Sequence, residues 1–455
     1  MSITTLTIRA RAAAEATRDW PRRAADWTLQ RQPLWRRRNY LTLWGGKLVS
    51  TTGSQMTQIA FPLLVLALTQ SAAIAGLAGA LRMLPYLLLS LPAGALVDRW
   101  DRRRVMIVCD SGRAIALGSI PVALLLGHLS VIQVCMVALV EGTLFVFFDI
   151  AEVAVLPNIV TQEEMPAAVA QYLSLTDGVT MLLGPALGGA LYALGRMVPF
   201  LLDAITYGAS VLALWRVQPP RQAASDQPAN PLNGRTMRDD IVTGILWLWR
   251  HQTLRALTAL LGAGNCLVAG EALLVIVLAE RMHATAPEVG LVLGLGGCGA
   301  VFGALLAERV VRRLTFAQAF IGGNWLVALL FLLYAAAPTP FALGLVMAGI
   351  GAVYAVINVA QYSYRMSLIP DELQGRVSSI IRLMLYGTLP LGLAVAGFAI
   401  EHVGAVATVL ALGVGLLLVA LAASLHPRIR NARMPNAPKP ATETETDDDA
   451  AAVAA

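Results

Sequence analysis

The sequence predicts an all-α polytopic membrane protein with twelve transmembrane helices in two pseudo-symmetric six-helix bundles. Of its 455 residues, 57% are hydrophobic and only 14% are charged, which is too little charge to cover a soluble surface. Apolar runs of about 20 residues, the length that crosses the hydrocarbon core at about 1.5 Å per residue, recur along the chain. Lys and Arg gather in alternate loops, as expected when they are retained on the cytoplasmic side.

Twelve apolar segments are predicted as membrane spans. They cover residues 41–68, 74–97, 105–126, 132–156, 169–194, 198–217, 254–279, 289–307, 315–336, 341–365, 377–400 and 404–425. Only helices and closed barrels satisfy their backbone groups in lipid. These segments are far longer than barrel strands and lack an alternation of period 2, so the sequence predicts a helical bundle.

The placement of basic residues predicts the orientation. With both termini in the cytoplasm, nearly every Lys and Arg lies in an inner tail, loop or flank. The exceptions are Arg196 and Arg281 at the outer face and Lys47, Arg82 and Arg113 within spans. This asymmetry predicts a multi-pass protein of the bacterial inner membrane with cytoplasmic termini. The net charge of +6 then reflects orientation and anionic lipid, and no nucleic-acid partner is expected.

Changes in composition divide the chain into five regions. They are a basic cytoplasmic segment at 1–38, a first six-helix bundle at 39–217, a cytoplasmic linker with an amphipathic helix at 218–250, a second bundle at 251–426 and a disordered cytoplasmic tail at 427–455. The first region mixes Arg with Trp, and two interpretations stay open: a segment lying on the inner leaflet, or an unstructured leader. The last region has the composition of a disordered segment.

The two bundles repeat each other at low identity. The span at 169–194 carries Gly184-Pro185-Ala-Leu-Gly188-Gly189, and the span at 377–400 carries a Pro-Leu-Gly run at 390–392. Repeated halves predict alternating access around a site at their interface. Coincidence among Gly-rich membrane helices is the alternative interpretation.

The loop after the second span holds a charged motif. Its sequence is Gly94-Ala-Leu-Val-Asp98-Arg99-Trp-Asp101-Arg102-Arg103-Arg104. It resembles the G-x-x-x-D-R-x-G-R-R signature that follows helix 2 in the major facilitator superfamily, and the resemblance covers nearly all of 38–425. Asp101 replaces the second glycine, which is similar to exporters typified by macrolide efflux pumps and the enterobactin exporter. The Gly184-Pro185-x-x-Gly188-Gly189 run resembles the tail of the helix 5 motif of antiporter-type exporters, although Thr180 replaces the preceding glycine of that motif.

The resemblance implies a gating role for this loop. Asp98 would accept hydrogen bonds from backbone N–H groups at the start of the eleventh span, near Val377. Arg102 would reach a carboxylate at the inner end of the fourth span, Asp149 or Glu152. Breaking these contacts would open the inner gate. Alternatively, the arginines of the loop act as topology determinants alone.

Three carboxylates within spans are candidates for proton coupling: Glu141, Asp177 and Glu271. A carboxylate at mid-bilayer costs about 2.5–3.5 kcal/mol on insertion scales, so it is expected to be paired, hydrated or protonated. Structural ion pairs with Lys47 or Arg82 are the alternative. The helix 4 arginine of many drug:proton antiporters is absent, with Glu141 in that region, so the resemblance does not carry a proton-relay arginine over to this chain.

The resemblance also implies that the first helix of each three-helix repeat lines the cavity. Polar stripes at helical spacing follow the first and tenth spans. The candidate lining residues are Lys47, Ser54, Gln58, Phe145, Tyr354, Asn358 and Gln361. An apolar and aromatic lining suits an amphiphilic substrate better than a sugar, whose hydroxyls require many polar partners. Core or lipid-facing positions are the alternative for the aromatic residues.

These observations favour a monomeric secondary exporter of amphiphilic small molecules, drug- or siderophore-like, driven by proton antiport. Its expected partners are the substrate, the proton and membrane lipid. The alternatives are a lipid or lysophospholipid flippase of the same fold, and a non-transporting assembly or sensor relative. An enzyme is not expected, because the chain has five histidines and neither a nucleophile elbow nor a phosphate-binding glycine loop. No cofactor or metal is expected.

Overall fold

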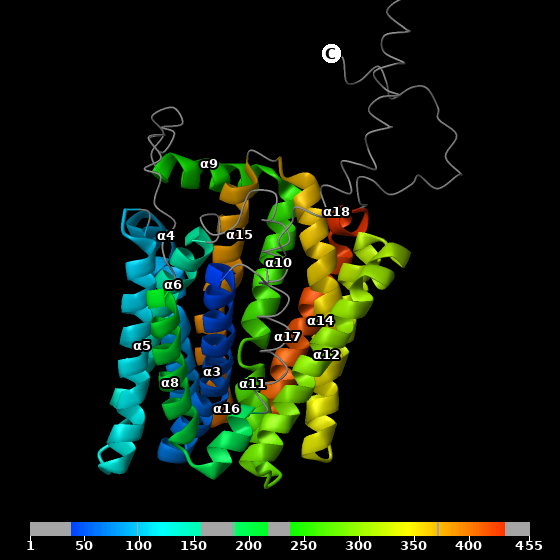
Figure 1. Ribbon diagram of the computed structural model, residues 1–455. Helices are drawn as coiled ribbons and strands as arrows, with labels where there is room; N and C mark the ends of the chain where they lie inside the picture. Colours follow the sequence, from blue (N-terminus) through cyan, green and yellow to red (C-terminus); the bar gives the residue numbers. More distant parts are fainter. Residues whose placement is uncertain are drawn as a thin grey trace, which may run out of the picture.

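The computed structural model describes residues 38–97, 99–155, 184, 187–216, 237–370 and 373–432. Within these residues the chain forms helices and short turns, with no β-strand (Figure 1). Ten of the described helical segments are long and apolar enough to cross a membrane. The prediction of an all-α polytopic membrane protein is confirmed. The basic N-terminal segment, most of the predicted fifth span, most of the linker and the C-terminal tail lie outside the described residues.

The described helices of the first bundle begin and end within a few residues of the predicted spans. They are α3 (Arg38–Thr69), α4 (Ala72–Val97), α5 (Arg102–Leu125), α6 (Val131–Val155) and α8 (Val198–Arg216). Helix α3 is 32 residues long, but its polar residues leave it outside the ten most apolar segments. Many of these polar residues lie on the side of α3 that lines a cavity of the first bundle.

Two predicted spans of the second bundle are each built from two helices. The helices of this bundle are α10 (Gln252–Val268), α11 (Glu271–Arg281), α12 (Ala286–Arg313), α13 (Gly323–Leu333), α14 (Pro340–Leu368), α15 (Gln374–Gly387), α16 (Leu389–Val403), α17 (Ala405–Leu425) and the short α18 (Pro427–Arg430). At the α10–α11 break, a Cβ added to Gly270 would lie 2.1 Å from the Cβ of Ala396. At the α15–α16 break, Pro390 stands in the first turn of α16, where its missing N–H is tolerated.

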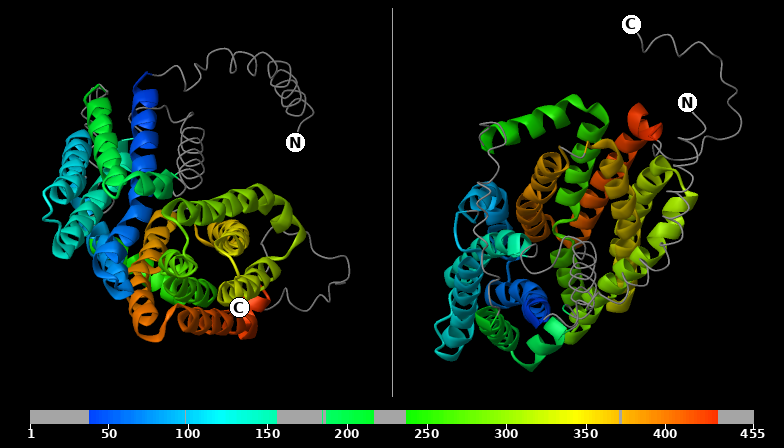
Figure 2. Two further views of the ribbon diagram at one scale, coloured as in Figure 1. Left: turned by 90° about the horizontal axis from the view of Figure 1, so that it is seen from below. Right: turned by 45° about the horizontal axis from the view of Figure 1, so that its top comes forward.

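The same helix pairs pack in both bundles. In the first bundle α4 packs on α6 and α5 packs on α8. In the second bundle, α12 packs on α14 and α13 packs on α17. These pairs join the second span to the fourth, and the third to the sixth, of each half. The two bundles stand side by side when viewed along the helices (Figure 2), so the chain folds as two repeated halves.

Helix α9 (Met237–Arg250) lies across one end of the bundles, roughly at right angles to the membrane helices (Figure 1). It packs on α15 and α10. Its buried side includes Leu248, whereas Ile245, Leu246 and Trp249 are exposed. An apolar face exposed on such a helix is typical of a segment that lies in the membrane interface.

The bundles meet at the opposite end, along α4 and α16. A Cβ added to Gly76 of α4 would lie 2.9 Å from the Cα of Gly397 of α16, so the two backbones touch. Beside them, the Glu401 carboxylate accepts hydrogen bonds from the Ser71 hydroxyl and, at 2.7 Å, from the backbone N–H of Ala73. These contacts between residues more than 300 positions apart close this end of the molecule.

Candidate functional site

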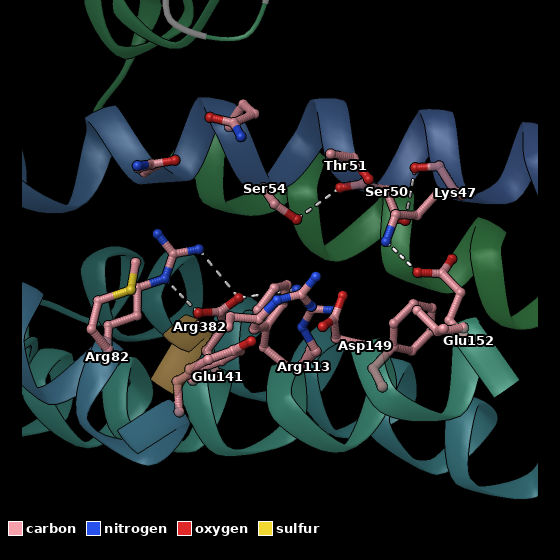
Figure 3. A pocket seen from close by; sticks show the side chains of 18 residues that line it. Lys47, Ser50, Thr51, Ser54, Arg82, Arg113, Glu141, Asp149, Glu152 and Arg382 are labelled. Carbon is pink, nitrogen blue, oxygen red and sulfur yellow. Dashed lines mark hydrogen bonds and ion pairs between the residues drawn. The ribbon is translucent and has the colours of Figure 1, made fainter. Parts of the chain in front are cut away.

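A cavity of about 400 Å³ is lined mainly by α3, α4 and α6 of the first bundle (Figure 3). The predicted residues that line it are Lys47, Ser54, Gln58, Glu141, Phe145, Asp149 and Glu152. The polar stripe of α3 and the acidic positions of α6 therefore face a common space. Their spacing explains this arrangement, because residues four, seven and eleven apart share one helix face.

Glu141 is the centre of a buried charge cluster. Its carboxylate accepts hydrogen bonds from Nε and Nη2 of Arg82, the latter at 3.2 Å. A third bond comes from Nη2 of Arg113 at 3.1 Å, and Nη1 of Arg113 also contacts Asp110 at 3.3 Å. The Glu141 side chain is only 2% exposed. Its charge is thus held by arginines from two neighbouring helices, α4 and α5, as Figure 3 shows for Arg82 and Arg113.

Tyr207 and Asp203 of α8 extend this cluster. The guanidinium of Arg113 lies 4.0 Å from the centre of the Tyr207 ring, a cation–π contact. The Tyr207 hydroxyl bonds to the Ser54 hydroxyl at 2.7 Å. Asp203 is fully buried and accepts a 2.6 Å hydrogen bond from Thr57 of α3. Helix α8 therefore ties the charge cluster to α3.

An ion pair between Lys47 of α3 and Glu152 of α6 lies further along the same cavity. The Lys47 ammonium also lies 5.5 Å from the centre of the Phe148 ring. The resemblance placed Arg102 against Asp149 or Glu152, whereas the Glu152 carboxylate is bound here by Lys47. The contact of Arg102 with Asp149 or Glu152 stays a prediction.

The charged loop after α4 is built from local caps. The Asp101 carboxylate accepts a 2.9 Å hydrogen bond from the N–H of Arg104 and so caps the start of α5. Arg103 donates to the carbonyls of Leu214 and Trp215 at 2.9 and 2.8 Å. These carbonyls belong to the last turn of α8, where cations are favoured. Arg103 thus has a structural contact in addition to its effect on topology.

The structure explains the other residues of this charged motif less directly. A Cβ added to Gly94 would meet no atom within 4 Å, so close packing does not explain this glycine in the present conformation. Arg99 is exposed in the turn. Asp98 lies outside the described residues, and its predicted contact with the start of the eleventh span stays untested.

A second cavity, of about 1120 Å³, lies in the second bundle. Asn358 and Gln361 of α14 line it as predicted residues, together with Asn265 of α10 and Arg382 of α15. Tyr354 instead packs against the apolar core of the second bundle. Helix α14 thus contacts the core as well as the cavity, and the predicted cavity role of Tyr354 stays a prediction.

Glu271 begins α11, the helix after the break at Gly270. Its carboxylate accepts a 2.7 Å hydrogen bond from the hydroxyl of the buried Tyr334. No Lys or Arg among the described residues lies within ion-pair distance of this carboxylate. The third predicted carboxylate, Asp177, lies outside the described residues.

The glycines of the helix 5 motif allow close packing. A Cβ added to Gly184 would lie 2.3 Å from the Cβ of Gln55, and one added to Gly188 would lie 2.8 Å from the carbonyl oxygen of Met56. A Cβ added to Gly189 would lie 2.5 Å from the Cα of Gly290 at the start of α12. Two glycines thus pack on α3, and the third contacts the other bundle. Pro185 lies outside the described residues.

The two cavities share the lining residue Arg382 of α15, and together we call them the chamber. Nearby, the rings of Tyr86 on α4 and Tyr386 on α15 lie 5.8 Å apart. Much of the lining belongs to α15, which packs on α9, whereas the closing contacts belong to the following helix, α16. The chamber therefore lies toward the α9 end, and the opposite end is closed.

Two repeated helical bundles around a chamber of this kind define a membrane transporter of the major facilitator fold. The family model described as "Transmembrane secretion effector" matches residues 31–452. The chain belongs to this family of major facilitator transporters.

Named relatives agree with this assignment. The Multidrug efflux pump Tap of Mycolicibacterium fortuitum is 30% identical over 405 residues, which cover 86% of this chain and 96% of that pump. The Macrolide efflux protein A of Streptococcus pyogenes is 28% identical over 158 residues, covering 35% and 39% of the two chains. A bacterial homolog of the human lysosomal transporter Spinster, solved in an inward-facing and unoccupied conformation, shares the fold. Its TM-score is 0.68 at 15% identity, with 86% of this chain and 96% of that chain covered.

Sequence reasoning did not identify the cluster around Glu141 as a unit. It noted Arg82 and Arg113 as basic residues inside spans, and this intramembrane placement was the available signal. Arg113 forms a local pair with Asp110 on α5, and its contact with Glu141 on α6 is not visible in the sequence of either helix. Arg382 was not among the predicted lining residues, although it lines both cavities.

Proposed function

We propose that the protein is a secondary transporter that exports amphiphilic small molecules, drug- or siderophore-like, by alternating access and proton antiport. The observation that carries this proposal is a chamber between two repeated bundles, closed at one end and lined by ionisable side chains. The similarity to named multidrug and macrolide efflux proteins supports drugs as substrates and export as the direction.

The chamber is proposed to open to the cytoplasm. Arg250 and Arg255 flank the junction of α9 and α10, and the Arg-rich loop before α5 lies at the same end of the bundles. Basic residues are retained on the cytoplasmic side, so the closed end faces outward. In the exporting half-cycle, the α4–α16 contact would separate while the α9 end closes.

The packing at the closed end favours such a two-state change. The Gly76–Gly397 approach joins bare backbone surfaces, and the hydrogen bonds of Glu401 are few and lie at the rim. Close backbone contacts of this kind can separate and re-form as the two bundles move as rigid bodies. The charge cluster around Glu141 lies within one bundle, so it can move intact with that bundle.

Glu271 is the proposed proton carrier among the described residues. An ionised carboxylate in an apolar region is unfavourable without a cation nearby, and its described partner is the Tyr334 hydroxyl. Binding a proton there removes a charge from the membrane region. Glu141, in contrast, is compensated by two arginines, which favours a structural and coupling role. Asp177 lies outside the described residues and stays a predicted proton-coupling residue.

Dye transport into everted membrane vesicles tests the proposal. Vesicles from an efflux-deficient host that expresses the protein are energised by respiration and given Hoechst 33342, a hydrophobic dye. We expect accumulation that a protonophore abolishes, and a reduction of at least about tenfold in Glu271→Gln. Glu308→Gln is the matched control, because that carboxylate forms an exposed pair with Arg312.

Two results would count against the proposal. Accumulation that persists with the protonophore would reject proton antiport. Absence of accumulation for this dye and for a panel of hydrophobic antibiotics, with folded protein in the vesicles, would reject drug export.

A further inference from the structure

Among the described residues, the cavity of the second bundle is lined by arginines without carboxylates. Arg365 of α14 and Arg382 of α15 both line it, and no Asp or Glu of the described part of the chain does. The cavity of the first bundle differs, because Glu141, Asp149 and Glu152 stand there among its basic residues. Neither Arg365 nor Arg382 forms an ion pair with any residue of the described part of the chain.

Two buried polar atoms in this cavity have no hydrogen-bond partner within the described structure. They are Oε1 of Gln361, whose residue is 6% exposed, and Nε of Arg365. Buried polar groups are otherwise nearly always bonded. Gln361 and Arg365 are four residues apart on α14 and therefore share one helix face. The wall of the cavity formed by α14 thus holds, just beneath its surface, a donor on a cation and an acceptor that lack partners in the described structure.

We infer that this cavity binds the anionic group of an amphiphile, a carboxylate or a phosphate. This inference rests on the proposed function and names the substrate class of the same chamber. Arg365 and Arg382 supply the positive charge and planar donors, which suit both anions. The carbonyl of Gln361, which has no partner in the described structure, accepts a hydrogen bond from a hydroxyl or N–H next to the anion once its side chain turns toward the cavity.

The surroundings fit the two ends of such a molecule. Asn265 and Asn358 add neutral polar groups to the lining near the arginines. The rings of Tyr362 and Tyr386 are about half exposed, at 55% and 51%, although they lie in a bundle of apolar helices. They line the same cavity and offer apolar surface to a hydrocarbon or aromatic tail.

Arginines at the inner ends of helices also follow from topology alone, which is the competing explanation. An arginine with only that role extends its guanidinium to water or lipid head groups. Arg365 instead has a shielded Nε atom, and its guanidinium lies 5.8 Å from the centre of the Tyr362 ring. This placement holds the donor inside the cavity.

Equilibrium binding to the purified full chain in neutral maltoside micelles tests the inference. The probes are dodecyl phosphate and dodecyltrimethylammonium at equal mole fraction, which share a tail and differ in charge. The readout is the probe concentration that gives half of the maximal rise in unfolding temperature. Inorganic phosphate, added as a competitor, distinguishes recognition of the free anion from recognition that requires the tail.

We expect dodecyl phosphate to bind at least about tenfold more tightly than dodecyltrimethylammonium. Arg365→Gln and Arg382→Gln should each lower the affinity for the anionic probe by about 10- to 100-fold, the usual effect of losing charge-assisted hydrogen bonds. Arg255→Gln is the control, because it removes an exposed arginine at the same membrane end but outside the cavity. It should change the affinity for the anionic probe less than about twofold. Competition by phosphate alone would support a site for the anion itself, and its absence would support an amphiphile site.

Equal affinity for the two probes would overturn the inference. A loss of affinity in Arg255→Gln as large as the loss in the two cavity variants would overturn it as well. The outcome is independent of the dye assay. Anion binding without any export would reject the proposed function while keeping the site, whereas dye export without preference for the anionic probe would reject the site alone.

Discussion

The charge cluster around Glu141 gives the sharpest prediction. Glu141→Gln preserves the size of the side chain and removes the charge that holds Arg82 and Arg113. Three hydrogen bonds from these arginines converge on the carboxylate, whose side chain is 2% exposed. Removing one partner of such a buried pair leaves unpaired charge, which costs about 3–5 kcal/mol. We therefore expect the free energy of unfolding to fall by about this amount.

Denaturant-induced unfolding in mild detergent, followed by tryptophan fluorescence, measures this loss. Glu308→Gln is the control, because its pair with Arg312 has side chains 74% and 78% exposed and should contribute less than about 1 kcal/mol. The double variant Arg82→Gln/Glu141→Gln should be less destabilised than the sum of its single variants, by about 1 kcal/mol or more. If Glu141→Gln unfolds like the control, or the double variant is additive, the cluster does not hold the bundle together and this reasoning is wrong.

Three further predictions concern the closed end and the second bundle. Gly76→Ala should impair the closure of α4 on α16 and reduce dye transport at least about tenfold. Gly45→Ala is the control and should leave transport unchanged, because its added Cβ meets no atom within 4 Å. Equal transport rates in the two variants would contradict the argument from close backbone approach. Glu401→Gln weakens the acceptor for the hydrogen bonds of Ser71 and Ala73 at the start of α4. Hydrogen–deuterium exchange in peptides that cover this start should become about three- to tenfold faster. Unchanged exchange rates would show that the carboxylate does not hold the closed end together. Tyr334→Phe removes the described donor to Glu271 and should lower the free energy of unfolding by about 1–3 kcal/mol, measured by the same denaturant titration; no change would mean that another group or water replaces the hydroxyl.

The sequence by itself determined the membrane helices and their approximate ends. Apolar length is a local property, since about 20 residues must cross the hydrocarbon whatever the neighbouring helices are. The predicted ends of α4 and α8, for example, lie within two residues of the observed ones. The pattern did not reveal the breaks at Gly270 and Thr388, because one or two residues outside the helices do not interrupt the long apolar run that predicts a span.

The sequence also indicated which residue types needed partners. Glu141 and Arg82 stood out because intramembrane charge is expensive, and helical spacing placed Lys47 and Ser54 on one face of α3. Arg82 was considered as an alternative partner for the carboxylates, but neither rule decides which residue on another helix it meets. A periodic pattern gives the direction of a side chain around its own helix axis, and says nothing of the rotation and height of the next helix.

Only the tertiary structure decided those partners. It joined Lys47 to Glu152 across 105 positions and Glu401 to Ser71 across 330, and it left Gln361 and Arg365 facing a cavity with unused hydrogen-bonding atoms. The physical reason is that a polar group inside the membrane must find its partner wherever helix packing brings one within about 3 Å. That packing depends on the fit of small residues such as Gly76 and Gly397 on separate helices, which no single segment of the sequence contains.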